Sequence, residues 1–245
     1  MFHFFVKQDQ IEEERICITG ADVNHMKNVL RMKQGEEILI SDGEGKDYYC
    51  KVHKLEKDQV IASIISKGSS ETELPAKLVL FQGLPKGDKM EFIIQKAVEL
   101  GVWEIVPVST KYTVVKLDGK KEENRLKRWN AIAESAAKQS KRGLIPKVRE
   151  IMTLDQALSY SQTFDMAIIP YEEARGMETA KQAVSAVKPG MKAGIFIGPE
   201  GGFAKEEIKA AVDHGAMPVS LGKRILRTET AGLAVLSVLM FALEE

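Results

Sequence analysis

The 245-residue sequence contains only two cysteines, Cys17 and Cys50, and four histidines. The cysteines form no Cys-x-x-Cys pair, and the histidines do not have the spacing of metal ligands. Disulfides are typical of small secreted proteins, and structural zinc needs clustered cysteines and histidines. The sequence therefore predicts a cytoplasmic protein with neither a disulfide framework nor a metal site.

No apolar run is long enough for a transmembrane helix. The longest, residues 231–243, falls short of the roughly 18–20 residues that a bilayer requires. We interpret it as a helix that is buried in a core or against another subunit. The apolar run at the N-terminus is too short for a signal peptide, and acidic residues follow it at once. We expect a soluble protein without a membrane partner.

Three common signatures of catalysis or nucleotide binding are also missing. Gly43-Glu44-Gly45 lacks the third glycine of a dinucleotide fingerprint, and residues 83–89 lack the Gly-Lys-Ser/Thr of a P-loop. No Gly-x-Ser-x-Gly is present, and His214 has no evident serine or cysteine partner. These absences disfavour dinucleotide enzymes, P-loop enzymes and hydrolases with a nucleophilic triad.

The sequence has no net charge, because 35 basic residues balance 35 acidic ones, but the charges are unevenly distributed. Residues 1–72 hold 10 basic and 13 acidic side chains, whereas residues 111–149, here called the basic stripe, hold 12 basic and 4 acidic ones. A basic stripe is typical of a contact with nucleic-acid phosphates, and such binding is sensitive to salt. A solvated helix face has the same composition, so charge alone leaves both interpretations open.

The first seventy residues show the alternation of β-strands, with turn signals between them. Four strands are predicted, at residues 13–19, 36–42, 47–55 and 59–67. One short helix fits residues 22–32, with Asp22 as its N-cap. Strands at this spacing predict a small β-barrel. The polar segment 67–73 marks the expected boundary between a domain of residues 1–72 and a second of residues 73–245.

The second domain alternates buried strands with helical patterns, which predicts an α/β fold with a mostly parallel sheet. The expected strands are residues 77–83, 103–110, 165–170, 193–198 and 217–222. A helix follows the first of them, and the last helix begins near Glu229. A long basic helix is expected over residues 121–142, and its buried stripe would comprise Leu126, Trp129, Ala133, Ala136 and Ser140.

Ligands of parallel α/β sheets bind at the carboxyl ends of the strands. Three such ends stand out: residues 168–173, 197–203 and 221–230. In the second, the glycines let a ligand approach the backbone, and Glu200 supplies a carboxylate. The alternative is a plain turn whose acidic residue favours the next helix N-terminus.

The third strand end combines cations and a carboxylate, namely Lys223, Arg224, Arg227 and Glu229. These cations suit a carboxylate, a phosphate or a nucleobase. An internal Arg–Glu ion pair that holds the loop is the alternative. These residues indicate a ligand-binding α/β domain that could contact RNA. They do not indicate which reaction it catalyses.

Five motifs carry a resemblance to a known family. IGPEGGF, LGKRILRTETA, GLPKGDKMEFIIQKAVELGV, RWNAIAESAAKQSKR and VLRMKQGEEILISDGEG occur in the sequence. Together they closely resemble the RsmE family of 16S rRNA uridine N3-methyltransferases, in order and over essentially the whole chain. The resemblance implies the SPOUT superfamily, with a PUA-like barrel, a C-terminal parallel-sheet domain that contains a trefoil knot, and a homodimer.

The resemblance also implies a cofactor, S-adenosylmethionine, and a substrate in the 30S subunit. It places the catalytic groups at Arg227, Glu229 and Glu200, with Glu229 as the preferred base. It gives the cofactor contacts as Ile169, Pro170, Ile197, Gly198, Pro199, Glu200, Gly201, Leu221, Gly222, Ile225, Leu226 and Arg227. It gives the RNA contacts as Lys86, Lys138, Lys141, Arg142 and Arg31. No metal is implied.

Three other functions remain open. The chain could be a SPOUT methyltransferase that acts on another RNA such as tRNA. It could instead be a catalytically silent RNA-binding or ribosome-assembly protein on the same fold. A nucleotide-binding enzyme of another chemistry is disfavoured by the missing phosphate motifs.

Overall fold

The computed structural model describes residues 1–114, 119–174 and 176–244, so residues 115–118 of the basic stripe lie outside it. The chain divides into two compact units. Unit 1 consists of residues 1–73 and 137–145, and unit 2 consists of residues 74–136 and 146–245. The sequence contained no signal that residues 137–145 belong with the N-terminal unit.

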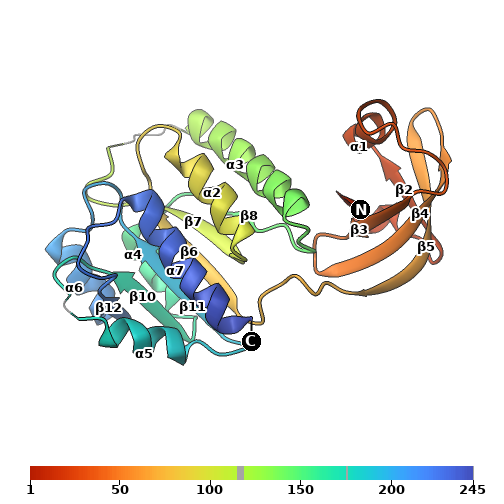
Figure 1. Cartoon of the computed structure of the whole chain (residues 1–245). Helices are drawn as coiled ribbons and strands as arrows, with labels where there is room; N and C mark the ends of the chain where they lie inside the picture. Colours follow the sequence, from red (N-terminus) through yellow and green to blue (C-terminus); the bar gives the residue numbers. More distant parts are fainter. Residues whose placement is uncertain (115–118, 175, 245) are drawn as a thin grey trace. The chain divides into compact units, whose positions relative to one another are not determined.

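Unit 1 is built on a five-stranded sheet in the order β1-β3-β4-β5-β2 (Figure 1). Its strands are β1 Phe2–Phe5, β2 Arg15–Thr19, β3 Glu37–Ser41, β4 Lys46–Leu55 and β5 Gln59–Ser69. β1 pairs with β3 in parallel and the other pairs are antiparallel. The four predicted strands are present. β1 was not predicted, because four residues are too few to show alternation. The sheet curls around one apolar core as a half-barrel.

The predicted helix of unit 1 differs from expectation. Gly20, not Asp22, is the N-cap of α1, Ala21–Asn24, and the chain continues as the π-helix η2, His25–Val29. Gly20 has φ 80°, a conformation that glycine adopts at no steric cost. The N-cap therefore lies two residues before the predicted one. Asp22 lies in the first turn, where its carboxylate is 3.4 Å from Lys138 Nζ.

Residues 137–145 are fixed in unit 1 by a buried ion pair. Arg142 is 3% exposed, and its Nε is 3.2 Å from Glu73 Oε1, while its Nη2 bonds the other oxygen. The same carboxylate accepts the backbone N–H of Leu144 at 3.2 Å. A Cβ on Gly143 would overlap Ser70, so the segment lies directly against the chain before Glu73. The expectation that Arg142 contacts RNA is wrong, because its guanidinium is buried against a carboxylate.

Unit 2 contains a seven-stranded parallel sheet in the order β12-β10-β11-β6-β7-β8, and β9 also pairs with β7. The strands are β6 Lys77–Gly83, β7 Glu104–Ser109, β8 Lys147–Val148, β9 Met152–Thr153, β10 Met166–Pro170, β11 Lys192–Ile197 and β12 Ala216–Val219. β6 is buried at six of its seven positions, as the apolar run KLVLFQG predicted. A strand that is buried on both faces has a continuous run of apolar residues in its sequence.

Helices cover both faces of this sheet (Figure 1). They are α2 Lys89–Glu99, α3 Gly119–Gln139, α4 Leu154–Ser161, α5 Glu178–Ala186, α6 Lys205–Asp213 and α7 Thr228–Leu243. Helices α4 and α6 share one apolar cluster with the strands, and α5 packs on the other side through Ala180 and Ala183. Of the predicted stripe of α3, Trp129, Ala133 and Ala136 are buried and Leu126 is half-buried. Ser140 lies beyond the end of the helix, which ends at Gln139.

α7 is apolar on all sides but only one side is covered. Leu236 and Leu239 are fully buried, whereas Phe241 is 81% and Val238 is 52% exposed. In the part of the chain that the structure describes, no helix combines the length and the apolar character needed to cross a bilayer. The exposed side of α7 is therefore an apolar surface on the outside of unit 2.

We predict that Glu73→Ala destabilises the protein by about 3–5 kcal/mol, because it removes the carboxylate that compensates the buried guanidinium of Arg142. Urea unfolding followed by circular dichroism measures the change. Glu71→Ala, at an exposed position two residues earlier, is the matched control and is expected to change stability by less than about 0.5 kcal/mol. Equal effects of the two substitutions would contradict the role of the ion pair.

Candidate active site

A cavity of about 510 Å³ opens at the carboxyl ends of β10, β11 and β12. The three loops that the sequence singled out line it together. Pro170 lines the cavity from the first loop, while its neighbour Ile169 is fully buried behind it. The other predicted cofactor contacts that line it are Ile197, Gly198, Pro199, Glu200, Gly201, Leu221, Gly222, Ile225, Leu226 and Arg227. Parallel strands place these loops at one edge of the sheet.

Glycines allow the loop after β11 to lie against its neighbours. A Cβ on Gly198 would be 2.9 Å from the Gly202 backbone, and a Cβ on Gly83 would be 2.6 Å from the nitrogen of Pro199. Real Cβ atoms are not found at such distances from backbone. Only glycine permits this close approach, and the loop therefore turns back on itself directly beside the end of β6.

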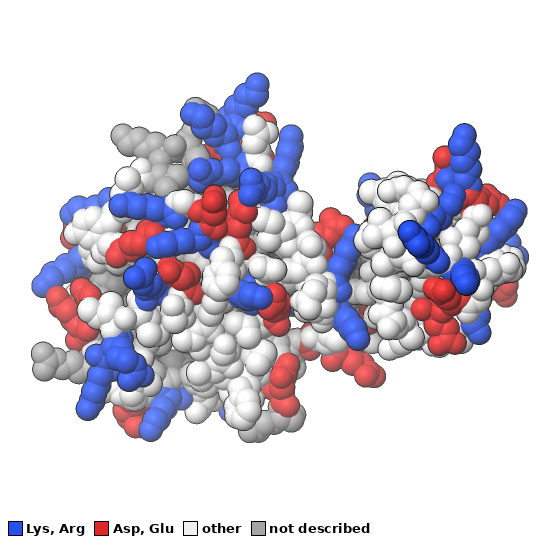
Figure 2. Space-filling model, turned by 45° about the horizontal axis from the view of Figure 1, so that its top comes forward, with Lys and Arg blue, Asp and Glu red and all other residues white. Residues whose placement is uncertain are grey.

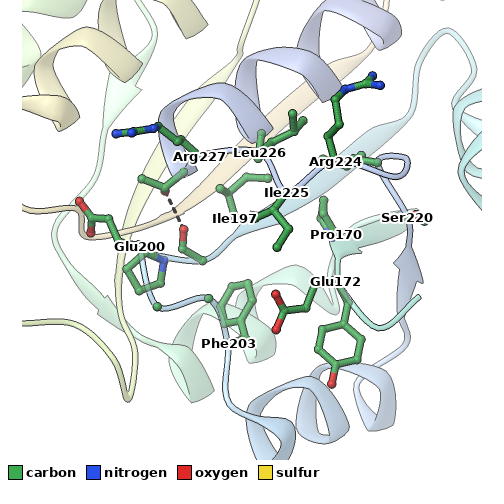
Figure 3. A pocket seen from close by; sticks show the side chains of 18 of the residues that line it. Pro170, Glu172, Ile197, Glu200, Phe203, Ser220, Arg224, Ile225, Leu226 and Arg227 are labelled. Carbon is green, nitrogen blue, oxygen red and sulfur yellow. Dashed lines mark hydrogen bonds between the residues drawn. The ribbon is translucent and has the colours of Figure 1, made fainter. Parts of the chain in front are cut away.

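A chain of hydrogen bonds holds the start of α7 under this loop. The hydroxyl of Thr228 donates to the carbonyl of Gly198 at 2.7 Å, the dashed line in Figure 3. The same oxygen accepts from Gln82 Nε2 at 2.9 Å, and that amide also donates to the carbonyl of Gly83 at 3.0 Å. Gln82 is fully buried and Thr228 is 6% exposed. One buried polar contact thus joins β6, the loop after β11 and α7.

The lining of the cavity mixes apolar and polar groups, and cations lie at its rim (Figure 3). Ile197, Phe203 and Glu172 line it, and Ile225, which also lines it, is 86% exposed. The side chains of Arg224 and Arg227 extend outward on opposite sides of the cavity. A concave pocket that combines apolar side chains with a few directed polar groups is typical of a small-molecule site. The two arginine side chains place positive charge at its mouth.

Glu200 is bound at the edge of the cavity. Its Oε1 accepts the backbone N–H of Lys86 at 3.1 Å and the ammonium of Lys89 at 2.8 Å. Burial raises the pKa of Glu200, but the hydrogen bond from Lys89 and backbone donors outweigh it, so that pKa lies below its ordinary value. The next helix is capped by Glu207, which accepts the backbone N–H of Ala204. Glu200 therefore binds the segment at the start of α2 and does not cap the next helix, α6.

Glu229 is the second residue of α7. Its Oε2 is buried and has no hydrogen-bond partner among the described residues, and it lies 3.6 Å from Lys89 Nζ. The hydrogen bond to Glu200, with both carboxylate charges, raises the pKa of Lys89. Sequence reasoning singled out both carboxylates but missed Lys89. The sequence feature that could have indicated Lys89 is its position in the polar segment that follows the buried strand β6.

The candidate RNA-contacting residues lie in both units. Lys86 belongs to unit 2, and its backbone holds Glu200. Arg31, Lys138 and Lys141 belong to unit 1. Arg31 and Lys141 are exposed and have φ of 53° and 59°, which is uncommon for residues with a side chain.

Half of the basic side chains of the basic stripe lie on α3. Figure 2 shows lysine and arginine side chains gathered at the edge of unit 2 that this helix occupies in Figure 1. Arg128 Nε is 2.7 Å from Glu91 Oε1 of α2, while Arg125 and Lys127 are exposed. Among the described residues no group of three or more potential metal ligands occurs.

Two family models match the chain. A model described as an RNA methyltransferase domain matches residues 72–240, and one described as an RNA methyltransferase PUA domain matches residues 18–65. Ribosomal RNA small subunit methyltransferase E of Bacillus subtilis is 38% identical over 100% of this chain and 98% of its own length.

Two solved structures are also similar over nearly their whole length. One is a methyltransferase from Legionella pneumophila in complex with the cofactor SAM, with a TM-score of 0.85 and 33% identity over 98% of this chain and 97% of that chain. The other is ribosomal RNA small subunit methyltransferase E from Neisseria gonorrhoeae bound to S-adenosyl methionine, with a TM-score of 0.83 and 33% identity over 97% and 95%. The chain belongs to the ribosomal RNA small subunit methyltransferase E family. The resemblance in the five motifs and the predicted fold class are thereby confirmed.

We predict that Thr228→Val destabilises this family member by about 1–3 kcal/mol, because it leaves the amide of Gln82 and the carbonyl of Gly198 without their buried partner. Valine has nearly the same shape, so packing is preserved. Thr230→Val makes the same change at an exposed position of the same helix and is expected to have little effect. Thermal unfolding of both variants measures the difference, and similar melting temperatures would refute the prediction.

Proposed function

We propose that the chain methylates N3 of a uridine in 16S rRNA, with S-adenosylmethionine as methyl donor, and that it does so in the cytoplasm. The observation that carries the proposal is the cavity at the ends of three strands, which brings Pro170, Glu200 and Arg227 together from the three loops that the sequence singled out. The full-length similarity to rRNA methyltransferases supports the class of reaction.

The cavity fits the proposed cofactor. Its volume of about 510 Å³ lies in the range of small-molecule sites, roughly 300–1,000 Å³. Apolar side chains such as Ile197 and Leu226 suit the adenine, and the exposed loop backbone can bind its polar edge and the ribose. Glu172 suits an ammonium group. When bound, the cofactor supplies a methyl group on a sulfonium that is its own leaving group, so no metal is required.

The chain's own task is then to bind, orient and deprotonate the uracil. N3 carries a proton at neutral pH and becomes a nucleophile only when that proton leaves. Glu229 is the proposed base, with Glu200 as the second candidate, because the carboxylate of Glu229 has one oxygen, Oε2, without a hydrogen-bond partner among the described residues. Arg227, whose guanidinium extends outward at the rim, would stabilise the negative charge that develops on the uracil oxygens.

RNA would bind to both units. Lys86 and the exposed cations of α3 lie on unit 2, and Arg31, Lys138 and Lys141 lie on unit 1. Residues 1–72 carry more acidic than basic side chains, so we propose that unit 1 recognises the shape of an unpaired segment rather than phosphate charge alone. The exposed cations of the basic stripe would supply the salt-sensitive part of the affinity.

Two features of the family resemblance also belong to this proposal. The exposed apolar side of α7, with Phe241 and Val238, supports a homodimer, because large apolar side chains in contiguous exposed patches mark interfaces. The convergence of the loops after β10, β11 and β12, tied by Thr228 to Gly198, supports a trefoil knot in this part of the chain.

Nucleoside analysis tests the proposed function. The purified protein is incubated with labelled S-adenosylmethionine and with 16S rRNA, either as bare RNA or as 30S particles. We expect N3-methyluridine. Another methylated nucleoside, or methylation of tRNA instead, would indicate a different methyltransferase of the same fold. Tight cofactor binding without methyl transfer to any of these RNAs would favour a silent RNA-binding protein.

We predict that Glu229→Gln lowers the rate of methyl transfer by about 10²- to 10⁴-fold, the usual contribution of a general base. Cofactor affinity, measured by calorimetry, is expected to stay nearly unchanged. Arg227→Ala is expected to lose both methyl transfer and cofactor binding, because it removes a cationic side chain from a residue that lines the cavity. Loss of cofactor binding in Glu229→Gln would remove Glu229 from the role of base.

A further inference from the structure

The two faces of the unit 1 sheet differ in what covers them. Successive residues of a strand point to opposite faces. On the inner face, Phe4, Ile40 and Cys50 are buried in the core of unit 1. On the outer face, Leu39 is half-buried and Tyr49 is 47% exposed. Strand β4 lies between β3 and β5 (Figure 1), so this exposed tyrosine is in the middle of the sheet and not at its edge.

The strand register gathers apolar side chains around Tyr49. On one side, Tyr49 is opposite Leu39 of β3. On the other side it is opposite Ser66 of β5, where a register shift leaves Ile65 as an extra residue next to Ser66. In such a bulge two residues oppose one, and Ile65 is 58% exposed. Leu39, Tyr49 and Ile65, here called the Tyr49 patch, therefore form an exposed apolar group across three strands.

Residues 137–145 cover one end of the same outer face. A Cβ on Gly143 would be 3.0 Å from Oδ1 of Asp47, which lies two positions before Tyr49 on β4. Asp47 and its cross-strand neighbour Ser41 are buried there. Leu144 continues the cover toward the turn between β3 and β4, where it forms bridges with residues 43 and 44. The segment that packs on this face thus leaves the Tyr49 patch exposed.

Cations border the patch on the side of this segment. His3 of β1 is opposite Leu39, so it lies in the same cross-strand row as Tyr49. Burial lowers the pKa of His3, and the positive charges of Lys138 and Lys141 act in the same direction. These two lysines therefore lie close to the row, and Lys141 is exposed.

The charges on the opposite side of the patch are mixed. Lys51, two positions after Tyr49, forms an exposed ion pair with Glu37 at 3.7 Å. In the same row Arg15 of β2 is exposed, and acidic residues 12–14 directly precede it. The positive charge that is available to a ligand therefore lies mainly on the side of residues 137–145.

An aromatic ring with cations on one side fits a nucleotide, whose base can stack on the ring while its phosphates bind the cations. The three side chains of the patch are too few for a stable protein interface, which buries about 800 Å² on each partner. All three also lie within residues 18–65, which match the model of an RNA methyltransferase PUA domain. The observations thus favour RNA as the occupant.

We propose that Tyr49 stacks on an unpaired base of the substrate RNA, and that Lys138 and Lys141 bind the adjoining phosphates. This inference rests on the proposed function, and it names the surface of unit 1 that holds the RNA. Every base has a flat π face, so the stacking contributes affinity and position rather than a choice of sequence. It explains how a unit whose first 72 residues have a net negative charge binds RNA.

The first test measures binding to a fluorescently labelled single-stranded oligouridine by anisotropy, with the full-length chain. Tyr49→Ala is expected to weaken binding roughly tenfold, the order of the loss of one stacked base. Tyr49→Leu keeps an apolar side chain but removes the ring, so it should bind as weakly. Tyr49→Phe should bind like the wild type. Binding to a double-stranded RNA of equal length should not depend on Tyr49, because its bases are already stacked.

Phe2→Ala is the matched control for the loss of a ring. Phe2 is 48% exposed on the same sheet, but it is opposite the fully buried Ile38 and so belongs to the inner face. Its substitution should leave the affinity unchanged. Salt separates the two kinds of contact. Lys141→Met should lower the slope of log Kd against log salt by roughly 0.7, whereas Tyr49→Ala should keep the slope of the wild type.

The second test locates the base directly. The oligouridine carries 5-iodouridine, which cross-links to an adjacent aromatic ring on irradiation, and the digested protein is analysed by mass spectrometry. We expect a cross-link at Tyr49 in the tryptic peptide 47–51 of the wild type, and at Phe in Tyr49→Phe. The other tyrosine of this peptide, Tyr48, is 7% exposed and should not react.

Three outcomes would overturn the proposal. One is an unchanged affinity in both Tyr49→Ala and Tyr49→Leu, and another is a cross-link that forms only elsewhere in the chain. The third is a change of oligomeric state in Tyr49→Ala, measured by sedimentation, which would make the patch a contact between two copies. The proposed function fails separately: if RNA binding depends on Tyr49 but no N3-methyluridine forms, the reaction is wrong and the binding surface stands.

Discussion

The hydrogen bond from Thr228 to the carbonyl of Gly198 is the contact on which the site depends. It joins the first residue of α7 to the loop after β11, and Gln82 joins both to the end of β6. Because Gln82 and Thr228 are buried, neither side chain can exchange its partner for water without a cost in free energy. The contact fixes the direction in which α7 begins, and therefore the place of Glu229, the next residue.

The fold was largely predictable because its signals are local. Alternation in the strands of unit 1 and continuous apolar runs in β6 and β11 come from the period and burial of each strand alone. The errors arose where one residue decides between alternatives. Gly20 replaced Asp22 as the helix cap because the chain enters the helix through a residue with positive φ, two positions before Asp22. The return of residues 137–145 to unit 1 depends on the pairing of Arg142 with Glu73, 69 positions apart.

The difference between local and long-range signals also explains which site residues could be predicted from the sequence. Glu200 and Glu229 follow strand ends in recognisable loops, so a sequence pattern marks them. Lys89 resembles any lysine on a helix, and its meaning comes from two carboxylates 111 and 140 positions later. Arg142 was misassigned for the opposite reason, since it lies in a basic stripe but is buried. Residue type predicts the kind of chemistry, whereas burial and partners decide which residue performs it.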